Sequence, residues 1–90
     1  MPDATSLLGF LAAALTSLSY LPQVSKALPR QSTGDLSLKM LLALLAGLSL
    51  WIFYGLTVGD PIIIAANAVG ATLVGFVLAC KVRDIASAGR

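Results

Sequence analysis

Three long uncharged stretches constrain this chain more than any other feature of its sequence. They cover residues 4–25, 40–59 and 61–80, and the charged residues fall between and beyond them. A helix rises about 1.5 Å per residue, so about 20 residues cross the roughly 30 Å hydrocarbon core of a bilayer. A soluble chain of 90 residues, 58% of them hydrophobic, could not bury all three stretches. The stretches therefore predict membrane-spanning helices.

The predicted fold is an all-α membrane protein with one domain over residues 1–90. We expect three transmembrane helices at about 5–24, 38–58 and 61–81. Asp35 or Ser37 can cap the second helix, because a side-chain oxygen there accepts a free backbone N–H. Small residues in the first helix allow close approach of a neighbouring backbone; they are Gly9, Ala12, Ala13, Ala14, Ser17 and Ser19.

The basic residues are divided unevenly between the connecting segments. The first connection and the C-terminal tail hold three each, whereas the N-terminus and the turn at Gly59–Asp60 hold none. These residues are Lys26, Arg30 and Lys39 in the connection, and Lys81, Arg83 and Arg90 in the tail. Basic segments stay in the cytoplasm. We therefore expect a multi-pass membrane protein with its N-terminus outside and its C-terminus in the cytoplasm.

The sequence lacks the side chains that enzymes and metal sites commonly use. It has no His, one Cys, and no Asp or Glu deep inside a predicted span. Its basic residues flank the spans and form no patch with aromatic residues, so a nucleic-acid partner is not expected. We predict no enzymatic activity, no cofactor, no metal site and no proton relay through acidic side chains.

Trp51 lies too deep in the second span to belong to an interfacial aromatic belt. Gly47 and Gly55 lie about one helical turn on either side of it, and we expect them to leave open space around the indole. Trp51 is then either a bulky packing residue between helices or part of a binding site.

Asn67 lies two turns into the third span. An amide in hydrocarbon is costly unless it forms hydrogen bonds, so Asn67 faces either a partner helix or a cavity. An aromatic ring with a neutral amide suits a sugar, whose C–H face stacks on the ring and whose hydroxyls bond to the amide. Three helices are too few to enclose such a pocket, and we expect a parallel homodimer of six helices to do so.

Pro22 has no N–H and crowds the carbonyl of Leu18, so the first helix kinks or ends there. The freed carbonyl needs a polar partner such as Gln23 or a water. Two interpretations remain open: Pro22 terminates the span, or it is a hinge in a carrier that changes conformation.

These features together resemble a known family. Pro22-Gln23, the loop SKALPRQSTGDLS, Trp51 with Tyr54, and the segment GDPIIIAAN are similar to the bacterial SemiSWEET sugar transporters of the PQ-loop (MtN3/saliva, SWEET) superfamily. The similarity covers essentially the whole chain. It implies a helix packing order of 1-3-2, a parallel homodimer in the bacterial inner (plasma) membrane, and alternating-access uniport of a mono- or disaccharide of the glucose or sucrose class.

The resemblance also implies roles for individual residues. Trp51 and Asn67 contact the sugar, and Pro22 with Gln23 forms the hinge. The outer gate is Tyr54 and Asp60, and the inner gate is Tyr20 and Met40. Some relatives pair the outer-loop Asp with an Arg. Here Val58 and Gly59 precede Asp60, and neither is basic, so the ion pair is not expected. We expect Asp60 to accept a hydrogen bond from the partner's Tyr54 instead. Two alternatives remain: a carrier of another small polar solute, and a non-transporting membrane assembly subunit.

Overall fold

The computed structural model describes residues 3–88. Four helices follow one another along this part of the chain: α1 (Ala4–Ser19), α2 (Leu21–Ala27), α3 (Leu38–Val58) and α4 (Pro61–Ala88). Only Tyr20 separates α1 from α2, and the two together form one spanning segment of 24 residues. The described chain thus has three segments that are long and apolar enough to cross a membrane. The predicted three-span, all-α membrane fold is confirmed.

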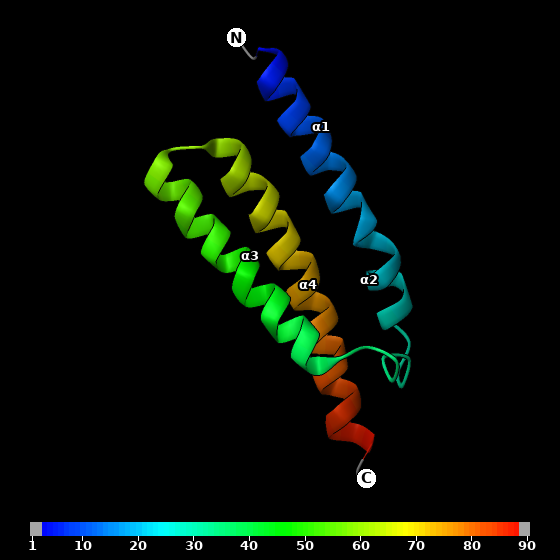
Figure 1. Cartoon of the computed structure of the whole chain (residues 1–90). Helices are drawn as coiled ribbons and strands as arrows, with labels where there is room; N and C mark the ends of the chain where they lie inside the picture. Colours follow the sequence, from blue (N-terminus) through cyan, green and yellow to red (C-terminus); the bar gives the residue numbers. More distant parts are fainter. Residues whose placement is uncertain (1–2, 89–90) are drawn as a thin grey trace.

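The last helix lies at the centre of the bundle. The backbone of α4 runs close to α3 on one side and to α1 and α2 on the other (Figure 1). Within residues 3–88, neither α1 nor α2 brings its backbone close to α3. In order of spans this arrangement is 1-3-2, as the family resemblance implies.

The connections separate to two ends of the bundle. The start of α1 and the α3–α4 turn lie at one end, here named the turn end, and residues 28–37 and the end of α4 lie at the other, the loop end (Figure 1). The basic side chains counted in the sequence belong to the loop end, except that Arg90 lies outside the described residues. The positive charge is therefore concentrated at one end of a membrane-spanning bundle.

The tight turn between α3 and α4 is built from three adjacent residues. Gly59 takes a left-handed conformation with φ of 70°, which a residue without a Cβ adopts without strain. The Asp60 N–H donates to the Gly55 carbonyl at 3.0 Å, and Pro61 begins α4. Asp60 Oδ1 accepts from two free backbone N–H groups of the new helix, at 3.0 and 3.2 Å. Asp60 therefore caps α4, a role that the sequence reasoning misses.

At the loop end, Ser37 caps α3. Its Oγ accepts the Met40 N–H at 3.1 Å, which decides between the two caps that the sequence allows. The other candidate, Asp35, instead forms an exposed ion pair with Lys26. The hydrogen bond from the Lys26 ammonium lowers the pKa of the Asp35 carboxyl.

The first span is interrupted at Tyr20, close to the predicted position. The Tyr20 N–H donates to the Ser17 carbonyl at 3.1 Å, three residues back instead of four, and the helix resumes at Leu21 with Pro22 in its first turn. Within residues 3–88, the Gln23 side chain forms no hydrogen bond to the freed carbonyl. The prediction that Pro22 kinks or ends the helix is confirmed.

The sequence predicts that the third span ends at about residue 81, but α4 continues to Ala88. Its 28 residues extend about 42 Å at about 1.5 Å each, which exceeds the roughly 30 Å hydrocarbon core. The last turns therefore project beyond the span. They are held there by contacts with residues 27–33, which a span prediction based on hydropathy does not register.

Asp84 is the centre of these contacts. It is only 6% exposed, and it accepts hydrogen bonds from Thr33 Oγ1 at 2.7 Å, the Gln31 N–H at 3.0 Å and Arg83 Nε at 2.8 Å. The Arg83 guanidinium also donates to backbone carbonyls at the end of α2 and beyond, those of Ala27, Leu28 and Pro29. Residues 27–33 are therefore bound firmly to α4.

The buried core lies in the half of the bundle near the loop end. It comprises Ala27, Leu41, Val74, Val77 and Cys80. In contrast, α1 has no buried residue. The tightly packed half supports the loop end, and the loosely packed half leaves room between α1 and the other helices.

Candidate functional site

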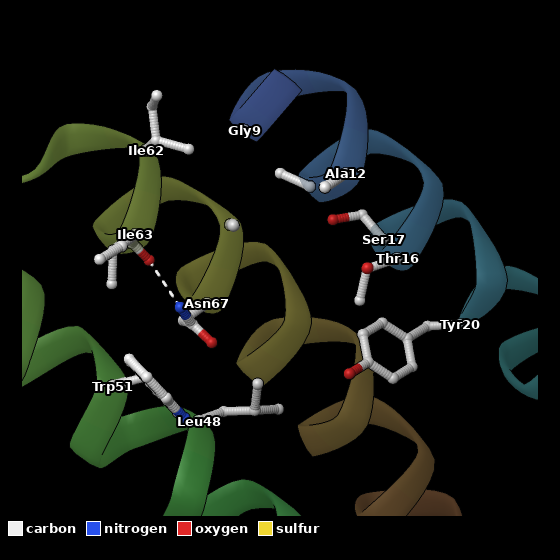
Figure 2. Close-up of a pocket in the computed structure, with 12 residues that line it drawn as sticks. Gly9, Ala12, Thr16, Ser17, Tyr20, Leu48, Trp51, Ile62, Ile63 and Asn67 are labelled. Carbon is white, nitrogen blue, oxygen red and sulfur yellow. Dashed lines mark hydrogen bonds between the residues drawn. The ribbon is translucent and has the colours of Figure 1, made fainter. Parts of the chain in front are cut away.

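A cavity of about 370 Å³ lies between α1 and α4, with α3 along one side. Figure 2 shows its lining residues arriving from all three spans. They are Gly9, Ala12, Ala13, Thr16, Ser17, Tyr20, Leu48, Trp51, Ile62, Ile63, Ala66 and Asn67. None of them is charged, so the cavity presents neutral polar groups and apolar surface to whatever enters it.

Trp51 and Asn67 both line this cavity, one from α3 and one from α4. The Asn67 side-chain NH₂ donates to the Ile63 carbonyl of its own helix at 2.8 Å, and Figure 2 shows its oxygen pointing away from Ile63. Within residues 3–88 Asn67 forms no bond to another helix. One amide N–H and the amide oxygen thus remain for a ligand.

Trp51 also borders a second hollow, of about 360 Å³, on the surface of α3. Its indole meets the Tyr54 ring edge to face, with the ring centroids 5.5 Å apart. Gly47 lines this hollow, and a Cβ on it would meet no atom within 4 Å. The expected open space beside Gly47 is confirmed.

The corresponding expectation for Gly55 is wrong. This glycine is buried against α4, where a Cβ would lie only 2.9 Å from Ile64 Cγ1 and 3.0 Å from Ile63 Cγ2. Although Gly55 lies one turn from Trp51, its position around the helix axis points it at α4. The glycine permits close approach of α3 and α4 and leaves no space around the indole.

Tyr20 and Leu48 bound the cavity on the side of the loop end. Both side chains pack over Gly70 of α4: a Cβ on Gly70 would lie 3.3 Å from Tyr20 Cε2 and 3.4 Å from Leu48 Cδ2. Tyr20, which the family resemblance assigns to the inner gate, is therefore at one limit of the cavity. Leu48 has the same position, and nothing in the sequence marks it.

The remaining predicted site residues do not line this cavity. Met40 is half-exposed in the first turn of α3, Tyr54 borders the second hollow, and Asp60 Oδ1 caps α4. Pro22 and Gln23 lie in the first turn of α2, directly after Tyr20. A single protomer thus unites Trp51, Asn67 and Tyr20 but not the two gates.

Two hydroxyl residues of the cavity, Thr16 and Ser17, have no role in the sequence reasoning beyond Ser17 as a small packing residue. Both line the wall that α1 contributes. The signal that could have found them is spacing, because one face of a helix carries residues i, i+3, i+4 and i+7, here Ala13, Thr16, Ser17 and Tyr20.

Across residues 3–88, no three His, Cys, Asp or Glu side chains gather as a metal site would require.

The model of the PQ loop repeat family matches residues 4–64 of this chain. A sugar transporter SemiSWEET from Bradyrhizobium diazoefficiens is 45% identical over 82 residues, which cover 91% of this chain and 95% of that protein. A sugar transporter SemiSWEET from Leptospira biflexa is 37% identical over 79 residues, 88% of this chain and 93% of that protein. The crystal structure of a bacterial homologue of SWEET transporters superposes with a TM-score of 0.85 at 32% identity, covering 91% of this chain and 99% of that one.

Proposed function

The chain belongs to the PQ-loop repeat family, and from this premise we propose that it carries a mono- or disaccharide across the membrane by alternating access. The observation that carries the proposal is the uncharged cavity that Trp51 and Asn67 both line. The named sugar transporters among its relatives support sugar as the substrate class. The protein acts as a transporter without enzymatic activity and without a cofactor.

A sugar fits the chemistry of this cavity. The indole of Trp51 offers a flat apolar face for the C–H face of a pyranose, and Asn67 offers a free N–H and an oxygen for its hydroxyl groups. The volume of about 370 Å³ is in the lower part of the roughly 300–1,000 Å³ range of small-molecule sites. A neutral substrate of the glucose or sucrose class is therefore favoured over an ion.

The working unit in this proposal is a parallel homodimer. One protomer has too few helices to enclose the cavity, and polar groups that face hydrocarbon are costly. A second copy, related by an axis along the membrane normal, encloses the cavity with six helices and brings two copies of Trp51 and Asn67 around it.

Pro22 and Gln23 provide the hinge. The interruption at Tyr20 separates α1 from α2, while Arg83 binds the carbonyls of Ala27 and Leu28 at the end of α2. Both helices pack on α4, but hydrogen bonds hold only the end of α2 there, since within residues 3–88 none joins α1 to α4. In this proposal α1 therefore tilts about the interruption while the loop end stays intact.

The gates are proposed at the two ends of the cavity. Tyr20 and Met40 close the inner side, and Tyr54 and Asp60 close the outer side. The cap of α4 uses Asp60 Oδ1, and within residues 3–88 the other carboxylate oxygen, Oδ2, forms no hydrogen bond. That oxygen is free to accept from the partner's Tyr54 when the outer gate closes.

Transport is proposed to be uniport, driven by the sugar gradient alone. The cavity has no acidic side chain that could carry a coupled proton. The positive loop end favours the cytoplasmic side of the bacterial inner membrane, which places the N-terminus outside and the C-terminus in the cytoplasm. A non-transporting assembly role is less favoured, because Asn67 donates to its own helix and bonds no other helix within the described chain.

Uptake of radiolabelled glucose and sucrose into proteoliposomes tests this function. We expect wild type to take up at least one of them, independently of a proton ionophore. Trp51→Ala and Asn67→Ala should abolish uptake, whereas Phe53→Ala, which removes an exposed aromatic residue outside both hollows, should not. Detergent sizing must show a dimer for every variant. A dimeric wild type that takes up neither sugar would overturn the proposal.

A further inference from the structure

Four hydroxyl groups in the spans bond to the backbone of their own helix. Ser49, Thr57 and Thr72 each donate to a backbone carbonyl three or four residues earlier in the same helix, at 2.7–2.9 Å. Ser19 does the same to the Thr16 carbonyl. This internal bond satisfies a hydroxyl in hydrocarbon without help from a neighbour.

Thr16 and Ser17 form no such bond within the described chain, and they line the cavity. Within residues 3–88 neither hydroxyl forms a hydrogen bond, and both side chains line the cavity that Asn67 also lines. Figure 2 shows their oxygen atoms on the side of α1 that faces α4. A hydroxyl that forgoes the bond within its helix and faces a cavity is available to a polar ligand.

The two hydroxyls lie across the cavity from the residues already proposed to contact the sugar. Trp51 and Asn67 come from α3 and α4, whereas Thr16 and Ser17 come from α1. A pyranose has hydroxyls on its whole rim, and within one protomer Asn67 alone would leave the hydroxyls that face α1 without partners. The wall of α1 supplies the second set.

We propose that Ser17, with Thr16 beside it, binds the sugar hydroxyls on the edge opposite Asn67 and helps to determine which sugar is accepted. This inference rests on the proposed function. We assign the main contact to Ser17, because its side chain is half-buried whereas that of Thr16 is exposed.

The position of Ser17 also connects binding to the hinge. Its carbonyl accepts the Tyr20 N–H at the interruption between α1 and α2. When α1 tilts about that point, the Ser17 hydroxyl moves relative to Asn67, which is fixed on α4. The contacts that the sugar makes with the two walls therefore change as α1 tilts.

Ser17→Ala removes the hydroxyl and keeps the small volume. We expect it to raise the KM for the transported sugar about tenfold, the effect of one lost hydrogen bond, while Ser17→Thr restores most of the affinity. Ser19→Ala is the matched control, since that hydroxyl bonds its own helix and lies outside the cavity, and its KM should equal that of wild type.

Monodeoxy analogues of the transported sugar sharpen the test. For the analogue that lacks the contacted hydroxyl, wild type and Ser17→Ala should have the same KM; for the others the tenfold difference should remain. A Ser17→Ala protein with the wild-type KM for every analogue would overturn the inference alone. A wild type that transports no sugar would overturn the proposed function as well, so the two failures are distinguishable.

A second measurement does not depend on the alanine variant. In a Ser17→Cys protein, the transported sugar should slow labelling by a water-soluble maleimide, whereas Ser19→Cys should be labelled at the same rate with and without sugar. The native Cys80 is buried, so its contribution to labelling is small. Equal protection or no protection at both positions would contradict the inference.

Discussion

The Thr33 hydroxyl donates a 2.7 Å hydrogen bond to Asp84, joining two residues that are 51 positions apart in the chain. Both residues are buried, Thr33 fully and Asp84 with 6% of its surface exposed. The contact fixes the segment between the first two spans against the end of the third. In the proposed transport cycle this end of the bundle stays rigid while α1 moves.

Asp84→Ala should therefore destabilise the protein strongly. It removes a buried acceptor of several hydrogen bonds, and one bond to a charged group contributes about 1.5–3 kcal/mol. The control is Asp35→Ala, which breaks only the exposed pair with Lys26, and exposed ion pairs contribute little to stability. Thermal unfolding in detergent, followed by circular dichroism, should show a large decrease in Tm for the first variant alone. Equal values of Tm would contradict the role of Asp84.

Gly55→Ala should disturb the packing of α3 on α4. Its Cβ would lie 3.1 Å from the Ile64 backbone nitrogen, which cannot yield as a side chain can, and overpacking costs about 1–3 kcal/mol. Gly75→Ala provides the comparison, because a Cβ there meets nothing within 4 Å. We expect a lower unfolding temperature for Gly55→Ala and no loss for Gly75→Ala. If both variants unfold like wild type, the close contact at Gly55 is not what sets the distance between the helices.

Pro22→Ala should slow transport more than it weakens sugar binding. Alanine restores an N–H that can bond to the Leu18 carbonyl, so α1 and α2 would join into a stiffer helix. Uptake rates in liposomes and a binding titration in detergent measure the two effects separately. Pro29→Ala, in the segment after α2, should change neither. Equal losses of rate and affinity in Pro22→Ala would count against the hinge.

The sequence predicts the spans and the pairing of Trp51 with Asn67 because these depend on local patterns. Helix length and hydropathy define a span, and an aromatic residue and an amide at similar depth are conspicuous among aliphatic residues. The second span, α3, begins at Leu38 and ends at Val58, as its uncharged run and its Ser37 cap predict.

The features that the sequence does not predict depend on rotation about a helix axis or on contacts between distant segments. Gly55 faces α4 and not the indole because of a rotation that spacing along the chain leaves undetermined. In the sequence Asp84 is one of several charged residues in the C-terminal tail, and only the structure shows that Thr33 donates to it. From the sequence Ser17 is a small packing residue. Only the structure shows that its hydroxyl lines the cavity and has no hydrogen-bond partner within residues 3–88, which leaves it available to bind a sugar.

The most direct test of the central claim, a sugar site lined by Trp51 and Asn67, is a fluorescence titration. Trp51 is the only tryptophan in the sequence, so intrinsic tryptophan emission reports on this position alone. Adding the sugar that the wild type transports should change the emission in a saturable way, and Asn67→Ala should abolish or strongly weaken the change. An emission that does not respond in a dimeric protein, at sugar concentrations that saturate its transport, would place the sugar elsewhere and contradict the account.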